Sequence, residues 1–244
     1  MILKTEAIVL KTYDYRETSR IAVFFTKDFG KVSGVMKGIR KDPRKFASSV
    51  DQCSVNTIVY YQYRNSDLHL ISQCDMHQFF QVIRADLRRS MAASYILELV
   101  HKIMPAEQRN QKIYQLMISF LKSLETAADV TQLVHMFQIK LLLFSGFRPH
   151  LDSCVKCKKK MTSDALFSSR EGGLLCPDHH GARTLPRISK GTVATILHVE
   201  QNLWQNCLKL RFTDSVRKEL KYLLNHFLIF HLGRNVRSAA YVHQ

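Results

Sequence analysis

Long apolar runs are missing from this sequence of 244 residues. No window approaches the roughly 18 uncharged apolar residues that a membrane span requires. Stretches such as residues 140–144 are short and are flanked by polar side chains. The first residues, MILKTE, also lack the basic start and apolar run of a secretory signal. We therefore expect neither a membrane protein nor an exported one, and we place the chain in the cytoplasm.

The signatures of common enzymes are missing as well. We find no nucleophile paired with a base, no paired carboxylates and no His-x-Glu deaminase motif. The spacing Gly34-x-x-x-Gly38 lacks the Gly-Lys-Ser/Thr ending with which a P-loop binds nucleotide phosphates. The sequence therefore predicts a binding protein that is not an enzyme.

Acidic residues are scarce relative to basic ones. Asp and Glu total 20 against 36 Lys and Arg, which gives a formal net charge of +16. Hydrophobic residues make up 46% and charged residues 23%, the balance of an ordinary globular protein of one or two domains. Such an excess of positive charge attracts phosphates and other polyanions, so we expect nucleic acid as the partner.

The N-terminal part of the sequence is β-rich. Five short segments combine β-branched and aromatic residues with turn signals between them: residues 6–10, 19–26, 31–36, 55–63 and 68–72. Five strands without an intervening helical pattern predict a small closed barrel. The OB-fold is the commonest nucleic-acid-binding barrel of this size, although SH3-like barrels also have five strands. We expect an OB-fold nucleic-acid-binding domain in residues 1–76.

Helical periodicity begins near residue 77. Apolar residues recur three or four positions apart as far as residue 103, and Pro105 ends the pattern. Further helices are predicted over residues 108–126, 130–145, 189–206 and 213–232. We therefore predict a multidomain α+β protein. Residues 77–244 would form an α-helical domain with a zinc-ribbon-like insertion at residues 150–186.

A cluster of metal-ligand residues interrupts the helical part. The pair Cys154-x2-Cys157 is followed, after 18 intervening residues, by Cys176-x2-His179, which matches the zinc-ribbon template. Zinc prefers four such ligands in a tetrahedron. His180 adjoins His179 and is the alternative fourth ligand. Because four protein ligands leave no open position, we expect one structural zinc ion per chain rather than a catalytic one.

A chance cluster of buried cysteines is the alternative interpretation. Lysines at position 156 and at positions 158–160 surround the first pair and disfavour deep burial. The other three cysteines are isolated in the sequence, and we expect them to be small core residues: Cys53, Cys74 and Cys207.

Two sets of basic residues are candidates for DNA contact. The first set lies between the third and fourth predicted strands and comprises Lys37, Arg40, Lys41, Arg44 and Lys45. The second set lies on predicted helices and comprises Arg84, Arg88, Arg217 and Lys221. Charged runs are ordinarily solvated surface, but the charge bias of the whole chain favours phosphate contact, above all for the loop. Aromatic residues near the strands are candidates for base stacking, none preferred over the others: Tyr13, Tyr15, Phe29, Tyr60, Tyr61 and Tyr63.

Six ordered motifs resemble a known family. They are AIVL at 7–10, YRETSRI at 15–21, FTKDFGK at 25–31, KGIRK at 37–41, LFSGFRPHLDSC at 143–154 and LGRNVRS at 232–238. No single motif is specific. Their order, which extends over almost the whole chain, is similar to that of RecO, the bacterial family of recombination mediators.

The resemblance implies an N-terminal OB-fold and a helical domain that holds a zinc-ribbon-like insertion. It also implies binding to single- and double-stranded DNA, annealing of complementary strands and, with RecR, loading of RecA onto DNA coated by single-stranded-DNA-binding protein. The acidic C-terminal tail of that coating protein is an implied partner, and RecF is left open as a further one. Complete fingers in the family usually carry four cysteines, whereas here the fourth place is His179, and Lys158 stands where glycine is common.

Three other functions remain as alternatives. An RNA-binding or ribosome-associated protein with an OB-fold and a zinc ribbon would prefer structured RNA. A metalloenzyme would need an open position on the zinc ion. A structural subunit of an assembly would place its positive charge against an acidic protein.

Overall fold

The structure is a computed structural model that describes residues 1–42, 46, 50–161, 164–179 and 185–233. Within these residues the chain forms two compact units. We call the first, Met1–Ala128, the barrel unit, and we call the second, which begins at Asp129, the helical unit. No helix in the described ranges is long and apolar enough to cross a membrane.

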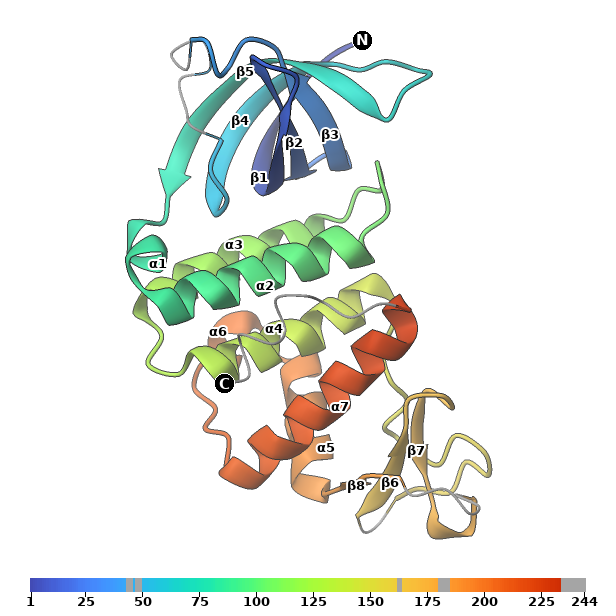
Figure 1. The fold of residues 1–244 in the computed structure, drawn as a ribbon. Helices are drawn as coiled ribbons and strands as arrows, with labels where there is room; N and C mark the ends of the chain where they lie inside the picture. Colours follow the sequence, from blue (N-terminus) through green and yellow to red (C-terminus); the bar gives the residue numbers. More distant parts are fainter. Residues whose placement is uncertain (43–45, 47–49, 162–163, 180–184, 234–244) are drawn as a thin grey trace. The chain divides into compact units, whose positions relative to one another are not determined.

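A closed barrel of five strands forms most of the barrel unit (Figure 1). The strands close in the order β1-β2-β3-β5-β4, and only β3 and β5 pair in parallel among them. Five strands closed in this way form the barrel of an OB-fold, which confirms the predicted fold class. The strands are β1 (Ile2–Tyr15), β2 (Ser19–Thr26), β3 (Gly30–Met36), β4 (Ser54–Tyr61) and β5 (Leu68–Phe79).

Strand β1 is much longer than the segment predicted from residues 6–10. Its first half pairs with β4 and its second half with β2, and the register shifts between Val9 and Lys11. A bulge of this kind bends a strand, which lets one strand close a barrel on both sides. The polar residues that follow Leu10 hide this second half from a search for apolar alternation.

The barrel core follows the two-residue period of its strands. Ala7 and Val9 of β1 and Ala22 and Phe24 of β2 are fully buried inside the barrel. Ile39, Phe46 and Val50 join the same core, although they belong to the connection between β3 and β4 rather than to a strand. These three side chains anchor that connection on the barrel.

Three helices complete the barrel unit and cover one end of the barrel (Figure 1). They are α1 (Gln81–Ala85), α2 (Leu87–Ile103) and α3 (Gln111–Thr126). The prediction of one helix starting near residue 77 was wrong at its beginning. Strand β5 continues to Phe79, which pairs with Ser54. Asp86 has extended dihedral angles (φ −115°, ψ 122°) between α1 and α2, and its carboxylate accepts the backbone N–H of Arg89 as the N-cap of α2.

The helices are fixed to the barrel through the first residues of β3. Lys31 Nζ donates to the carbonyl of His101 on α2 at 2.8 Å, and the N–H of Glu107 donates to the carbonyl of Lys31 at 3.0 Å. Burial lowers the pKa of the Lys31 ammonium. Gly30 has a positive φ of 69°, and a Cβ there would lie 2.2 Å from the carbonyl oxygen of Gln108. Only glycine therefore fits this position without displacing backbone.

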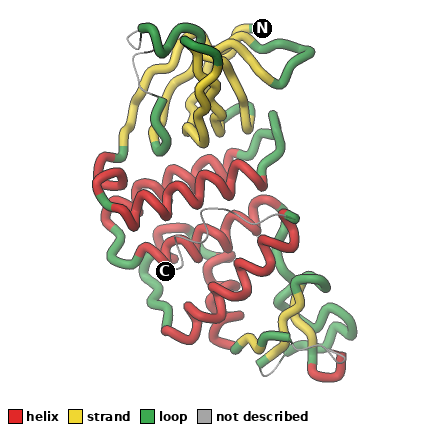
Figure 2. The backbone as a smooth tube through the Cα atoms, viewed as in Figure 1, coloured by secondary structure: helices red, strands yellow, loops and turns green. Residues whose placement is uncertain are grey.

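The helical unit is built around α4 (Val130–Ser145), of which residues 132–142 are all buried. A helix that is buried on all sides needs no amphipathic pattern. Helices α5 (Lys190–Gln201) and α7 (Asp214–Leu232) pack against it, and α6 (Trp204–Cys207) packs against α5. A small sheet in the order β7-β6-β8 interrupts these helices (Figure 2). Its strands are β6 (Ala165–Ser168), β7 (Gly173–Leu175) and β8 (Arg187–Ile188).

Helix ends in the helical unit are satisfied by charged side chains from neighbouring helices. Lys140 of α4 is only 5% exposed, and its Nζ donates to the carbonyls of Glu200 and Asn202 at the C-terminal end of α5. A cation at that end also complements the helix dipole. At the other end of α5, Glu219 of α7 accepts both the backbone N–H and the hydroxyl of Ser189, at 2.8 and 2.9 Å. These contacts tie α4, α5 and α7 into one unit.

The carboxylate of Glu219 makes the stability of this unit depend on pH. Burial alone would raise the pKa of Glu219, but hydrogen bonds from Thr192 and Ser189 lower it below the ordinary 4.5. Because the folded-state pKa lies below the unfolded one, the stabilisation is present above pH 4.5 and is lost as the pH falls further. We expect Glu219→Gln to lower the free energy of unfolding at pH 7 by about 1–3 kcal/mol, and to flatten its decline in acid.

Urea unfolding at pH 7 and at pH 4 measures both effects. Glu17→Gln is the matched control, because Glu17 is exposed in the turn between β1 and β2 and should leave the unfolding free energy unchanged. An E219Q variant as stable as the wild type at pH 7 would remove Glu219 as the link between α5 and α7.

Candidate metal centre and nucleic-acid interface

Four metal-ligand side chains converge in the insertion of the helical unit. The sulfur atoms of Cys154, Cys157 and Cys176 and a ring nitrogen of His179 all lie within 4.8 Å of one another. Cys157 Sγ and Cys176 Sγ are 3.8 Å apart, and Cys176 Sγ lies 3.0 Å from His179 Nδ1. Two sulfurs bound at about 2.3 Å in a tetrahedron would be about 3.8 Å apart. The donor set and its spacing therefore fit a zinc ion.

The first pair of ligands lies on a tight turn. The N–H of Cys154 donates to the carbonyl of Lys159, and the N–H of Lys158 donates back to the carbonyl of Cys154, both at 2.9 Å. Lys158 takes a φ of 61°, the left-handed conformation that glycine adopts most easily. Glycine is common at this position in the family that the sequence resembles. The left-handed backbone of Lys158 explains that preference.

The second pair follows a short hairpin. Strands β6 and β7 pair antiparallel, and Cys176 comes directly after Leu175 at the end of β7. A single 3₁₀ turn, Pro177–His179, then brings the imidazole back, with the N–H of His179 donating to the carbonyl of Cys176 at 3.0 Å. The alternative ligand, His180, lies outside the described residues.

The surroundings of the cluster favour thiolate at one position. Burial opposes ionisation of Cys154, but the backbone N–H groups of Cys157, Cys176 and Lys156 lower its pKa to about 6. Burial raises the pKa of Cys176. Leu175 is buried with Cys154 and Cys176, and Val155 and Leu166 pack against them. Apolar neighbours and a cysteine that ionises easily suit a metal that binds thiolate ligands. Four protein ligands would leave no coordination position open for a substrate.

The basic loop that follows β3 is exposed at its cationic residues. Lys37, Arg40 and Lys41 all project from a turn in which the N–H groups of Lys41 and Asp42 donate to the carbonyl of Gly38. The N–H of Arg40 donates to the carbonyl of Thr18, which holds this loop against the turn between β1 and β2. Arg40 also lies 3.9 Å from the carboxylate of Asp14. The two further predicted contacts in this loop, Arg44 and Lys45, lie outside the described residues.

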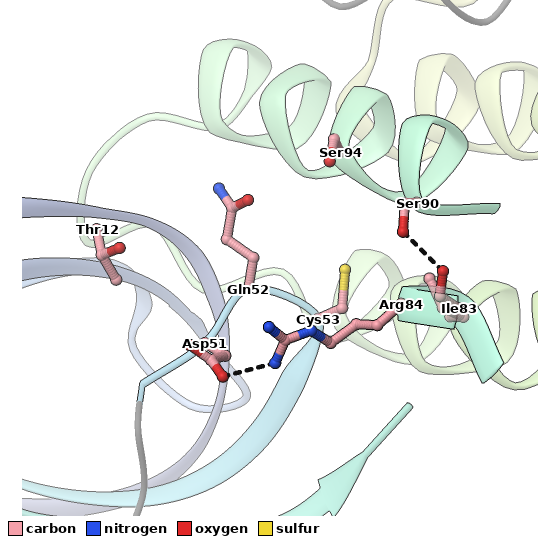
Figure 3. A pocket seen from close by; sticks show the side chains of 8 residues that line it. All are labelled: Thr12, Asp51, Gln52, Cys53, Ile83, Arg84, Ser90 and Ser94. Atoms are coloured by element: carbon pink, nitrogen blue, oxygen red, sulfur yellow. Dashed lines mark hydrogen bonds and ion pairs between the residues drawn. The ribbon is translucent and has the colours of Figure 1, made fainter. Parts of the chain in front are cut away.

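The predicted contacts on helices have different surroundings. Arg84 pairs with Asp51 at 2.7 Å, lies over the ring of Phe79, and lines a pocket between the barrel and α2 (Figure 3). Arg217 pairs with Asp129, the N-cap residue of α4, and so contributes to the fold of the helical unit. Arg88 on α2 and Lys221 on α7 are exposed. Contact between DNA and these four helix residues stays a prediction.

The aromatic candidates divide into buried and exposed ones. Tyr60 is buried and stacks on His69 with ring centroids 5.5 Å apart, and Phe29 packs against its ring edge. Tyr13, Tyr61 and Tyr63 are 40%, 42% and 47% exposed. Sequence reasoning missed Lys11, whose ammonium lies 4.5 Å from the centre of the Tyr13 ring. The alternation of Lys11, Tyr13 and Tyr15 in the second half of β1 was the available signal.

Comparisons with known proteins agree along the whole chain. The family model described as "Recombination protein O N terminal" matches residues 1–80, and the one described as "Recombination protein O C terminal" matches residues 84–240. A DNA repair protein RecO of Alkaliphilus metalliredigens is 30% identical over 238 residues, which cover 96% of this chain and 95% of the relative. A DNA repair protein RecO of Syntrophomonas wolfei is 31% identical over 225 residues, which cover 92% of this chain and 89% of the relative.

Proposed function

This chain belongs to the RecO family of DNA repair proteins, and from that membership we propose that it binds single- and double-stranded DNA and anneals complementary strands. The single observation that carries the DNA-binding part is the loop after β3, where Lys37, Arg40 and Lys41 are exposed beside an OB-fold barrel. The net charge of +16 supports the same conclusion.

Annealing on such a surface needs no bond chemistry. Two single strands repel each other through their phosphates, and a strongly cationic protein neutralises that charge and raises their local concentration. Contacts to the phosphate backbone position the strand without reading its sequence. Lys37, Arg40 and Lys41 would therefore hold strands while their base edges remain available for pairing.

We also propose the partners that the family resemblance implies. The protein would act with RecR to load RecA onto single strands coated by single-stranded-DNA-binding protein, and would bind the acidic tail of that coating protein. RecF would be a further partner in the same nucleoid-associated repair. The runner-up function is that of an RNA-binding or ribosome-associated OB-fold protein, because the same cationic loop would contact RNA phosphates equally well.

We propose that Cys154, Cys157, Cys176 and His179 hold one structural zinc ion. Bound there, the ion would cross-link the two knuckles and contribute folding free energy to residues 150–186, since structural zinc sites are folded by their metal. The ligands' own contribution is to present three sulfurs and one imidazole nitrogen on two short turns.

Fluorescence anisotropy with a labelled single strand at several salt concentrations tests the proposed function. We expect binding that ignores sequence and weakens steeply with salt, because each phosphate contact releases counterions. Addition of the complementary strand should then give faster annealing than DNA alone. A structured RNA competitor that displaces the single strand at much lower concentration than unlabelled DNA would favour the RNA-binding function instead. Absence of binding to either DNA form at low salt would contradict the proposal.

A further inference from the structure

A short loop, residues 62–67, joins β4 to β5, and we call it the β4–β5 loop. Its side chains from Tyr63 to Asp67 are all exposed. In OB-folds the corresponding loop is one of those that contact oligonucleotides. Arg64 gives the loop a cation that can contact a phosphate. The β4–β5 loop is therefore a candidate for DNA contact in addition to the basic loop after β3.

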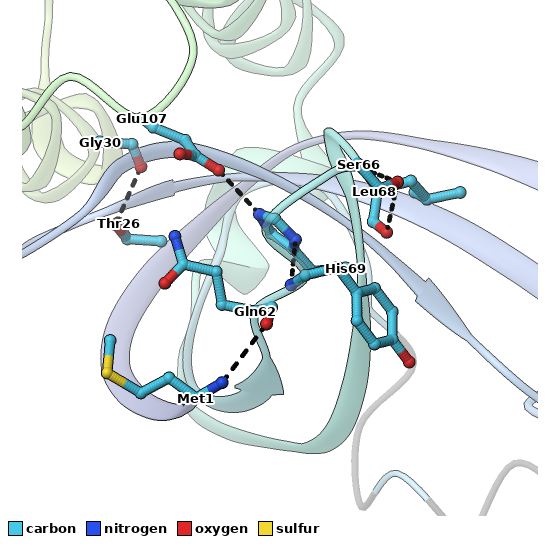
Figure 4. A network of polar contacts seen from close by, with 9 residues as sticks. Met1, Thr26, Gly30, Gln62, Ser66, Leu68, His69 and Glu107 are labelled. Carbon is cyan, nitrogen blue, oxygen red and sulfur yellow. Dashed lines mark hydrogen bonds and ion pairs between the residues drawn. The ribbon is translucent and has the colours of Figure 1, made fainter.

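A buried histidine fixes the middle of this loop (Figure 4). His69 of β5 is 1% exposed, and its Nδ1 accepts the backbone N–H of Tyr63 at 3.3 Å. The start of the loop is held separately, because Gln62 exchanges two hydrogen bonds with Met1, at 2.8 and 3.4 Å. The described residues show no further hydrogen bond to residues 63–65. The part of the loop that carries Arg64 is therefore held through His69.

Glu107 determines which ring nitrogen of His69 is the acceptor. Its carboxylate lies 2.8 Å from His69 Nε2. Since a carboxylate only accepts, the proton of the neutral ring is on Nε2, and Nδ1 keeps the lone pair that the N–H of Tyr63 requires. Glu107 lies between α2 and α3, where its N–H donates to the carbonyl of Lys31 and its φ is 55°. A residue other than glycine keeps that conformation only where its surroundings hold it, so the position of this carboxylate is well fixed.

A second proton on His69 would break the contact with the loop. Both nitrogens of an imidazolium are donors, so Nδ1–H would face the N–H of Tyr63, donor against donor. The contact between Nε2–H and the carboxylate of Glu107 would remain. Histidine is the side chain that ordinarily changes charge between pH 5 and pH 8. The hydrogen bond to the loop therefore exists only while the ring of His69 is neutral.

The ionisable groups around His69 leave it as the group that titrates in this range. Tyr60 of β4 stacks on its ring with centroids 5.5 Å apart, and burial together with the Glu107 charge raises the pKa of Tyr60 to about 12. On β3, Gly34 is the paired residue and has no side chain, and the ammonium of Lys31 donates instead to the carbonyl of His101. The charged side chains of the loop itself are Arg64 and Asp67, both exposed.

We propose that His69 and Glu107 are positioning residues for DNA binding, which hold the β4–β5 loop ready for a phosphate contact by Arg64 while His69 is neutral and release it when His69 is protonated. The proposal rests on the DNA binding proposed above and adds a dependence on pH. A loop that is held before binding has no ordering cost to meet, whereas a released loop has one. The contribution of Arg64 to affinity therefore falls as the pH falls. Protonation of exposed histidines acts in the opposite direction, because it adds positive charge.

Two substitutions separate the two ring nitrogens of His69. In His69→Asn the amide oxygen takes the place of Nδ1, so it accepts the N–H of Tyr63 and does not titrate. In His69→Gln the amide reaches the place of Nε2, so it keeps the contact with Glu107 and loses the loop. Arg64→Ala removes the proposed phosphate contact at an exposed position, where the fold is not at risk. His226→Asn is the matched control, because His226 is exposed on α7 in the helical unit.

The affinity of each protein for a single strand of thymidines is measured by anisotropy from pH 5.5 to pH 8. The label is a pH-insensitive fluorophore, and the ionic strength is held constant. Thermal unfolding at each pH checks that the variants are folded. A further variant, Glu107→Gln, removes the carboxylate while leaving His69 in place.

We expect the ratio of wild-type affinity to His69→Asn affinity to fall about two- to tenfold between pH 8 and pH 5.5, the factor that corresponds to one net hydrogen bond. His69→Gln should bind more weakly than the wild type by a similar factor at pH 8. Arg64→Ala should bind more weakly at pH 8 and lose the relative fall at low pH. Glu107→Gln should show that fall at lower pH, because the imidazolium loses its carboxylate partner. His226→Asn should follow the wild type.

Several results would overturn the proposal while DNA binding itself stands. Parallel pH profiles for the wild type and a folded His69→Asn variant would show that protonation of His69 does not reach the DNA. If the His69 variants do not fold, an Arg64→Ala variant with wild-type affinity at every pH would reject the loop as a contact. A pH profile unchanged in Glu107→Gln would remove Glu107 from the assignment. A wild type that binds no DNA at any pH would instead overturn the proposed function.

Discussion

Replacement of Cys154 by serine is expected to abolish stoichiometric zinc binding and to unfold the insertion at residues 150–186. Cys154 is fully buried, and it has the thiol whose pKa is lowered to about 6. Structural zinc contributes apparent binding free energies of about 10–16 kcal/mol in small finger peptides. The strands of the small sheet are only two to four residues long. The insertion therefore has little apolar core to replace the contribution of the zinc ion.

Elemental analysis of the purified protein and limited proteolysis measure this effect. The wild type should carry one zinc ion per chain and resist cleavage in the insertion, whereas C154S should carry none and be cut there. Cys53→Ser is the matched control, because Cys53 is a buried cysteine of the barrel unit and is not one of the four clustered ligand residues. His179→Ala should behave as C154S and His180→Ala as the wild type. A wild-type protein that lacks metal and is indifferent to a chelator would contradict the zinc assignment.

Removal of the charges from the loop after β3 is expected to give the largest loss of DNA affinity. The triple variant Lys37→Ala, Arg40→Ala and Lys41→Ala removes three exposed cations. Each phosphate contact contributes about 0.7 to the slope of log affinity against log salt for single strands and about 0.9 for duplex DNA. We therefore expect the slope to become shallower by about 2 for single strands and by nearly 3 for duplex, with at least a tenfold loss of affinity at low salt.

A matched variant separates the position of these charges from their number. Lys112, Lys122 and Lys209 are exposed lysines outside the predicted contact set, and their replacement by alanine removes the same net charge. Salt titrations of both triple variants should show a large change only for the loop. If both lose affinity equally, the protein binds DNA through its overall charge, and the loop has no special part.

Local patterns in the sequence were sufficient for the features that depend on neighbouring residues. The β-branched and aromatic residues of 19–26 predict β2, and the bounds observed are the same. The two-residue spacing of Cys154 and Cys157 predicts one knuckle, because both ligands lie on one turn. The convergence of both pairs also followed from the sequence, since the intervening hairpin reverses the chain.

Features that depend on distant residues could not be read in this way. The end of β5 is set by the pairing of Phe79 with Ser54, whereas the apolar spacing around Phe79 is equally compatible with a helix. Lys140 occurs in a helical pattern as an apparent surface residue, but its ammonium is buried at the end of α5. The domain boundary predicted at residue 76 and the predicted DNA contacts stay predictions.

The double pairing of β1 has a consequence for how the barrel folds. At one end of β1, Tyr15 pairs with Ser19, which is close in sequence. At the other end, Ile2 pairs with Tyr61, which is nearly sixty residues away. Contacts of large sequence separation are formed late and slow the folding of β-proteins. The hairpin of β1 and β2 can form early during synthesis, but its apolar inner side stays open until β4 has been made. We expect this half-barrel to be the aggregation-prone intermediate of the chain.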